Sequence, residues 1–220
     1  NGKTEDRSLG YNTYRLADAF EALLREGKIS MDVLDDKASR VLRTIFRTSM
    51  NPKKVIGSQC SEAHYDACSR IGEEGIVLLR NSNNLLPIVA SQYKRILVVG
   101  DNATRNMTMG GGSSELKTKF DISPLEGLRA LYGDKIDFAP GYYAGRALYN
   151  KVDKLDPKKL AKMKAEALAK AKDADLVIFV GGLNKNTNQD CEDSDRDSYD
   201  LSYGQNELIS ALAQVQPNII

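Results

Sequence analysis

Two short segments of this chain are apolar at every position, and they limit its fold more than any other feature. The segments are 96–99 (ILVV) and 176–180 (LVIFV). A strand with one face in water alternates apolar and polar residues, so an unbroken apolar run of this length indicates a strand that is buried on both faces. Such strands are typical of a parallel sheet that is covered by helices on both sides.

Helical patterns separate these strands. We expect helices at 63–73, 124–131, 157–172 and 205–213, and further strands at 76–79, 135–138 and 218–220. Strands that alternate with helices along the chain predict an α/β fold with a mostly parallel sheet. We therefore predict that residues 63–220 form an α/β sandwich.

Two more helices are predicted before this region. Apolar residues recur at helical spacing on either side of Gly27, Ser30 is expected to cap the second helix, and Asp32 lies in its first turn. Two helices of this size cannot bury their apolar stripes alone, which predicts that they end a larger domain. We expect residues 1–50 to belong to that domain and residues 51–62 to form a linker.

The composition excludes several classes of function. A net charge of +1 provides no field that would hold nucleic acid or an anionic membrane, and no apolar run approaches the roughly 20 residues of a membrane helix. The three cysteines, Cys60, Cys68 and Cys191, show no CxxC pair, and the only histidine, His64, is expected to be an ordinary residue of a helix. We therefore expect no zinc site and no cofactor. Cys60 and Cys68 are expected to be free, buried thiols rather than a disulfide.

A glycine-rich loop follows the first buried strand. It begins at Gly100 and includes the run 110–114 (GGGSS). A dinucleotide site needs GxGxxG at the turn from strand to helix, and a nucleotide phosphate loop needs GxxxxGK[ST]; neither pattern occurs here. Two interpretations remain equally open: a surface loop, or a loop whose backbone approaches a ligand closely.

An acidic loop follows the second buried strand. Four carboxylates, Asp190, Glu192, Asp193 and Asp195, lie within six residues and precede Arg196. The spacing does not fit a calcium loop. The remaining interpretations are a solvated acidic surface, or a site in which crowded carboxylates keep one carboxyl protonated so that it can act as a general acid. In a parallel sheet this loop and the glycine-rich loop would open on the same edge.

The order of the motifs decides between these interpretations, because together they resemble glycoside hydrolase family 3. In chain order they are 76–81 (IVLLRN), 85–88 (LLPI), 100–103 (GDNA), 110–114 (GGGSS), 123–128 (SPLEGL), 182–184 (GLN), 192–196 (EDSDR) and 201–209 (LSYGQNELI). The resemblance extends over essentially the whole chain, since the first two helices are similar to the end of the family's barrel domain.

The resemblance implies retaining hydrolysis of β-glycosidic bonds at the non-reducing end of oligosaccharides, without a metal or a cofactor. Glu192 would be the general acid/base, and the nucleophilic aspartate would lie upstream of Asn1. Ser113 and Ser114 would contact the sugar. Residues 1–50 would be the last helices of a (β/α)₈-type barrel against which the α/β domain packs. The implied partner is a β-linked oligosaccharide or glycoside, and the implied location is periplasmic or secreted.

Two positions depart from the family pattern. Asp193 replaces the glycine that follows the acid/base, and Ser202 replaces the proline of the L-P-x-G-Q motif. Asp193 adds a negative charge beside Glu192 and removes a residue that adopts positive φ easily. Two alternatives to a β-glucosidase are a β-xylosidase of the same family and a non-catalytic α/β module that binds sugar or serves a structural role.

Overall fold

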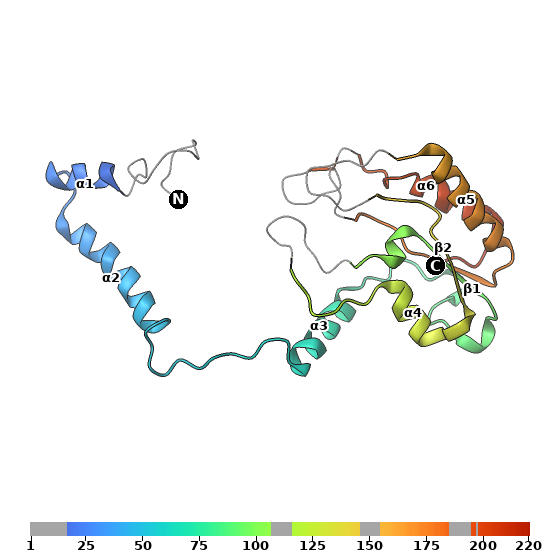
Figure 1. Ribbon diagram of the computed structural model, residues 1–220, viewed down its shortest axis with the longest axis horizontal. Coiled ribbons are helices and arrows are strands. Elements are labelled where there is room, and N and C mark those ends of the chain that lie inside the picture. Colours follow the sequence, from blue (N-terminus) through green and yellow to red (C-terminus); the bar gives the residue numbers. More distant parts are fainter. Residues whose placement is uncertain (1–16, 107–115, 146–154, 185–194, 197) are drawn as a thin grey trace. The chain divides into compact units, whose positions relative to one another are not determined.

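The computed structural model describes residues 17–106, 116–145, 155–184, 195–196 and 198–220 (Figure 1). The chain divides into two compact units, Asn1–Val77 and Leu78–Ile220. The expected domain boundaries near residues 50 and 62 stay a prediction. No helix in the described ranges is long and apolar enough to cross a membrane.

The described part of the first unit contains three helices, and none of their residues is buried. They are α1 (Asp18–Arg25), α2 (Met31–Arg47) and α3 (Glu62–Gly75). The apolar stripe of α2 is exposed, with Val41 60% and Phe46 57% accessible. Ser30 occupies the N-cap position of α2 as expected, but its side chain makes no capping hydrogen bond within the described ranges.

The cysteine and histidine side chains of this unit differ from two expectations. Cys60 and Cys68 are free, as predicted, but both are exposed rather than buried, because the helices around them bury nothing. Cys191 lies outside the described residues. His64 is more than an ordinary helix residue: the backbone N–H of Ser61 donates to its Nδ1 at 3.3 Å, which ties down the first turn of α3.

The second unit is built on a parallel sheet, which confirms the predicted α/β class. Its strands are β1 (Ile96–Val99), β2 (Ile136–Ala139) and β3 (Leu176–Phe179), in the order β2-β1-β3. Ile96 pairs with both Ile136 and Leu176, so the three strands are in step. Ile219 forms a parallel bridge with Val177 beyond β3, where the last predicted strand was expected.

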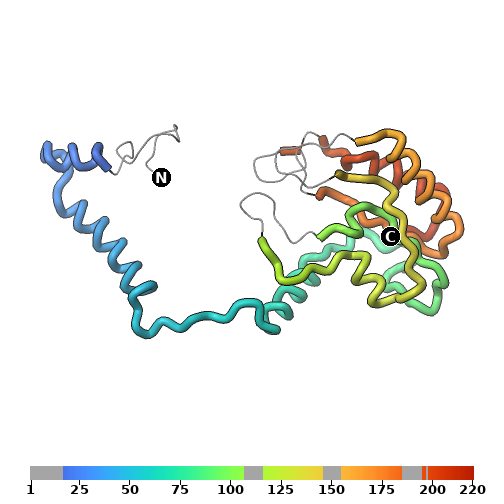
Figure 2. The backbone as a smooth tube through the Cα atoms, in the orientation of Figure 1, coloured from blue at the N-terminus to red at the C-terminus, as the bar shows by residue number. Residues whose placement is uncertain are grey.

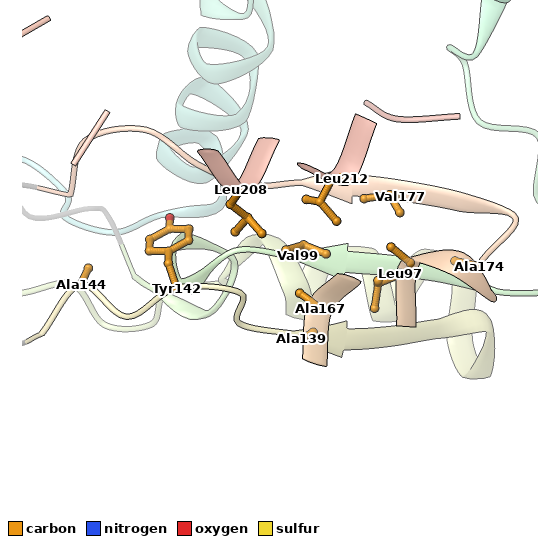
Figure 3. Close-up of a cluster of buried hydrophobic side chains, with 11 residues drawn as sticks. Leu97, Val99, Ala139, Tyr142, Ala144, Ala167, Ala174, Val177, Leu208 and Leu212 are labelled. Atoms are coloured by element: carbon orange, nitrogen blue, oxygen red, sulfur yellow. The ribbon is translucent and has the colours of Figure 1, made fainter. Parts of the chain in front are cut away.

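Helices cover both faces of this sheet. They are α4 (Pro124–Tyr132), α5 (Pro157–Lys172) and α6 (Gln205–Val215), and the chain trace in Figure 2 follows them through the unit. Leu97 and Val99 pack in one cluster with residues of α5 and α6 (Figure 3), whereas Ile96 and Val98 pack in a second cluster with Leu125 of α4. The alternation explains why β1 is apolar throughout: its neighbouring side chains enter two different cores.

The placement of α4 and α5 follows from the strand order. The chain moves from β1 to β2 through α4, and then returns across β1 to β3 through α5. Right-handed crossovers that run in opposite directions along a sheet place their helices on opposite faces. Where the direction of the crossovers reverses, the chain leaves one strand toward one face of the sheet and leaves the neighbouring strand toward the other face.

One predicted strand is wrong. Residues 76–79 form no strand with any described residue, and their apolar side chains are between 61% and 92% accessible. An apolar run specifies a strand only when another strand pairs with its backbone. The segment that follows contains the 3₁₀ turns Ser82–Asn84 and Ala90–Gln92; two more, Asp101–Thr104 and Gly133–Lys135, lie near β1 and β2.

Candidate active site

The candidate site lies at the carboxyl edge of the sheet, between β1 and β3. After β1 the chain enters the turn η4 (Asp101–Thr104) and continues toward α4, whereas after β3 it continues toward α6 on the other face. Neighbouring strands whose chains diverge in this way leave the crevice in which α/β sheets bind ligands. The geometry therefore brings together, at this edge, the first residues of the two loops that the sequence singled out, at Asn102 and Gly182.

Asn102 connects the beginnings of these two loops. It is 5% accessible, and its Nδ2 donates to the carbonyl oxygens of Gly182 at 3.3 Å and Leu183 at 3.5 Å. Its Oδ1 is also buried and accepts no hydrogen bond within the described part of the chain. This buried oxygen can therefore still accept a hydrogen bond at the edge of the sheet.

Gln205, the first residue of α6, holds the same stretch of backbone from the other side. Its Oε1 accepts from the Gly182 N–H at 2.8 Å, and its Nε2 donates to the Gly182 carbonyl at 3.1 Å and to the Ser202 carbonyl at 2.9 Å. The side chain is fully buried. A buried carboxamide with its donor and acceptor both used contributes to stability and fixes the orientation of its partners.

Tyr142 supplies the third buried polar group. Its hydroxyl accepts from the Asn102 N–H at 3.3 Å and donates to the Val180 carbonyl at 3.4 Å, while its ring packs near Phe179 and Tyr203. Burial raises the pKa of Tyr142 to about 12, and the hydrogen bond from Asn102 opposes part of this rise. The phenol therefore stays protonated and remains a donor throughout the neutral range.

An ion pair joins the loops that follow β1 and β2. Arg105 binds the Asp101 carboxylate at 2.6 Å, and the two side chains are 18% and 14% accessible. Arg105 also donates to the Gly145 carbonyl, and the Ala144 N–H donates to the same carboxylate at 3.4 Å. The pair stabilises the loops that follow β1 and β2, since each charge has several partners.

Gly100 is required where β1 ends. Its φ of 132° is unfavourable for any other residue, and a Cβ atom there would lie 2.0 Å from the carbonyl oxygen of Val180. The lone glycine that fits no nucleotide motif therefore allows the backbones of the two loops to approach each other.

The residues predicted to act on substrate, Glu192, Ser113 and Ser114, lie outside the described residues. What the structure brings together is the start of each loop, at Asn102 and Gly182. Beyond the acidic loop, Arg196 donates from Nη2 to the Tyr199 carbonyl at 3.0 Å.

Three residues at this edge were missed as functional candidates: Asn102, Tyr142 and Gln205. Asn102 and Gln205 were noted only as letters of the GDNA and LSYGQ motifs. The sequence did contain a signal for Gln205. It is a polar residue that directly follows Gly204 and precedes the apolar stripe of α6, which is where a helix begins. Nothing in the sequence indicated the partners of Tyr142.

One hollow in the second unit has, among the described residues that line it, no acidic side chain that could serve acid chemistry. A hollow lies between residues 78–86 and 217–220, and its lining includes Arg80 and Asn81 but no acidic side chain. Within the described ranges, no group of three or more His, Cys, Asp or Glu side chains is placed to hold a metal ion.

Relatives agree with this architecture. Beta-glucosidase BoGH3A of Bacteroides ovatus is 50% identical over all of this chain, which covers 30% of that protein, and Thermostable beta-glucosidase B of Acetivibrio thermocellus is 29% identical over 90% of this chain and 24% of its own length. The chain thus spans less than a third of these relatives. The crystal structure of a Bifidobacterium adolescentis GH3 beta-glucosidase matches with a TM-score of 0.73 and 28% identity, over 92% of this chain and 27% of that one.

A family model covers most of the same region. Residues 76–220 match the Glycosyl hydrolase family 3 C-terminal domain, and this range contains the whole sheet and the carboxyl edge of β1 and β3. The match includes the GDNA and LSYGQ motifs, whose Asn102 and Gln205 hold Gly182. The chain belongs to glycosyl hydrolase family 3.

Proposed function

We propose that the protein to which this chain belongs is a retaining β-glucosidase that releases sugar from the non-reducing end of β-linked substrates. The observation that carries this proposal is the 50% identity, over the entire chain, to a protein named as a beta-glucosidase. Three side chains at the carboxyl edge support it, because they hold together the points at which the glycine-rich and acidic loops begin.

Glu192 is the proposed general acid/base. In the first step it gives its proton to the glycosidic oxygen as the bond to the anomeric carbon breaks and an aspartate outside this chain forms a covalent bond to that carbon. In the second step the Glu192 carboxylate takes a proton from water, which attacks the anomeric carbon and releases the aspartate. The two carboxyl groups of retaining enzymes are held about 5–5.5 Å apart.

Ser113 and Ser114 are the proposed sugar contacts. Their hydroxyls can donate to and accept from sugar hydroxyls, and the glycines before them let the backbone approach a ligand without a side chain in between. The chain begins this loop beside Asn102, so the proposal places the sugar contacts and Glu192 on loops that leave the same crevice.

The test compares substrates that differ in their need for a proton. In the full-length protein, Glu192→Ala should lower kcat/KM by about 100-fold or more for an alkyl or phenyl β-glucoside, but far less for a dinitrophenyl β-glucoside, whose leaving group departs without protonation. Azide should restore turnover of the activated substrate and give a β-glucosyl azide. Asp190→Asn, in the same acidic loop, is the control and should retain the wild-type dependence on the leaving group.

Equal losses on both substrates would contradict the acid/base role of Glu192. A panel of aryl β-glucoside and β-xyloside substrates distinguishes the proposed activity from its alternatives. A higher kcat/KM for the xyloside would identify a β-xylosidase instead, and no turnover of either substrate by the full-length protein would favour a non-catalytic module.

A further inference from the structure

The backbone just beyond β3 is held by side chains instead of by a neighbouring strand. Ladder hydrogen bonds end near Val180, whose N–H donates to the Val99 carbonyl at 2.7 Å. Past that point Tyr142 binds the Val180 carbonyl, and Gln205 and Asn102 bind the polar groups of Gly182 and Leu183. We call these three side chains, Asn102, Tyr142 and Gln205, the edge anchor.

The members of the edge anchor come from three different elements. Asn102 lies in η4, Tyr142 follows β2, and Gln205 begins α6. All three are at least 95% buried, and Asn102 is bonded to Tyr142 through its backbone N–H. The direction in which the chain leaves β3 is therefore fixed by hydrogen bonds from three separate elements.

We infer that the edge anchor positions the acid/base of the proposed glycosidase by fixing the backbone at Gly182 and Leu183, from which the acidic loop starts. The inference rests on the proposed function, since it assigns Asn102 and Gln205 as positioning residues for Glu192. Both side chains act on backbone groups and need not touch substrate. A displacement of about 1 Å in a catalytic group can lower a rate by roughly 100-fold, so an anchor of this kind has a kinetic consequence.

Helix α6 offers a matched pair of buried glutamines for the test. Gln205 begins the helix, and Gln216 follows its last residue; each makes three hydrogen bonds to described backbone groups, Gln216 with Ala171 at 3.3 Å, with Ala174 and with Asn218 at 3.0 Å. Methionine preserves the length of either side chain and removes its hydrogen bonds. Gln216 binds backbone groups near the start of β3, at the opposite edge of the sheet from Gly182.

The experiment measures kcat/KM of the full-length protein for a phenyl and a dinitrophenyl β-glucoside, at a temperature at which every variant is folded by circular dichroism. We expect Gln205→Met to lower the phenyl glucoside value by about 10- to 100-fold more than the dinitrophenyl value. Gln216→Met should lower the melting temperature about as much as Gln205→Met does. It should nevertheless change the ratio of kcat/KM for the phenyl glucoside to kcat/KM for the dinitrophenyl glucoside by less than about threefold. Gln214→Met, at an exposed position of the same helix, should alter neither.

Asn102→Leu provides an independent variant if Gln205→Met does not fold, because it leaves the Gln205 hydrogen bonds in place. A ratio unchanged from wild type in whichever of the two variants folds would overturn the inference, and so would an equal change in Gln216→Met. If Glu192→Ala itself shows no dependence on the leaving group, the proposed function fails first. If Glu192→Ala shows that dependence and the anchor variants do not, only the edge anchor is wrong.

Discussion

Gly100, at the carboxyl edge of the sheet, occupies a position that has no room for a side chain. Gly100→Ala should destabilise the second unit by about 3 kcal/mol or more, because the new Cβ would meet the Val180 carbonyl oxygen 2.0 Å away at a φ of 132°. Urea unfolding measures the loss. Gly127→Ala is the control of opposite sign: Gly127 lies inside α4, where alanine is favoured by about 0.5–1 kcal/mol and the nearest atom is 4.0 Å away. Equal effects of the two changes would refute this steric argument.

Asp175 makes the stability of the unit depend on pH. The Arg95 and Lys94 backbone N–H groups donate to its Oδ2 at 2.9 and 2.7 Å and lower the pKa of the carboxyl below its usual value. Stabilisation by a carboxylate with a lowered pKa is complete above the unfolded pKa of about 3.9 and is lost as the pH falls through the folded value. Asp175→Asn should therefore lower the urea midpoint at pH 7, and its difference from wild type should shrink below about pH 4.

Asp134→Asn, at an exposed position of the same unit, is the control for this titration and should leave the midpoint at pH 7 nearly unchanged. A difference between Asp175→Asn and wild type that stays constant from pH 7 to about pH 3 would contradict the assignment, because the carboxylate would then contribute nothing through its charge.

At the scale of elements, the start of α4 is fixed by a reciprocal cap. The Ser123 N–H and Oγ–H both donate to Glu126 Oε2 at 2.7 Å, and the Glu126 N–H donates back to Ser123 Oγ. Ser123→Ala should cost about 1 kcal/mol in urea unfolding. Ser30→Ala, at the N-cap of α2 where the side chain makes no capping hydrogen bond to any described residue, should cost clearly less. A larger loss at Ser30 would show that the caps do not act as the contacts indicate.

The elements that the sequence predicted correctly are those whose own side chains determine them. Ile96–Val99 is apolar throughout because its residues enter two cores, and α5 was predicted at its observed bounds from its apolar spacing. Residues 76–79 were predicted as a strand from the same kind of run, and the prediction is wrong because backbone pairing depends on a distant partner. Periodicity reports burial, whereas pairing is a property of the fold.

The candidate site was predictable to a different degree. That the loops after β1 and β3 open on one edge follows from parallel topology, and the motifs supplied Glu192, Ser113 and Ser114 through resemblance. The hydrogen bonds between Asn102, Gln205 and Gly182 join residues that are 23 to 80 positions apart. No local pattern specifies such contacts, because the same carboxamide on an exposed turn would bind water.

At the scale of the whole molecule, the two units differ in how much apolar surface they bury. Strand β1 of the second unit is fully inaccessible and three of the four residues of β3 are buried, whereas the three described helices of the first unit bury no residue and leave Met31, Leu42 and Phe46 at 49–59% accessible. Apolar surface on this scale normally lies against another part of a protein. The expectation that these helices pack in a barrel domain accounts for it, and this packing stays a prediction.

The last prediction concerns activity. A retaining mechanism needs two carboxyl groups held at a fixed separation, and the proposed nucleophile is outside this chain. The purified 220-residue chain should therefore show no turnover of a dinitrophenyl β-glucoside above a mock preparation from cells that do not express the chain, even when circular dichroism shows that the α/β unit is folded. The activated substrate is the strictest choice, because it needs no proton donor and reports the nucleophile alone. A rate that co-purifies with the chain and exceeds that of the mock preparation would place a nucleophilic carboxyl group within these residues.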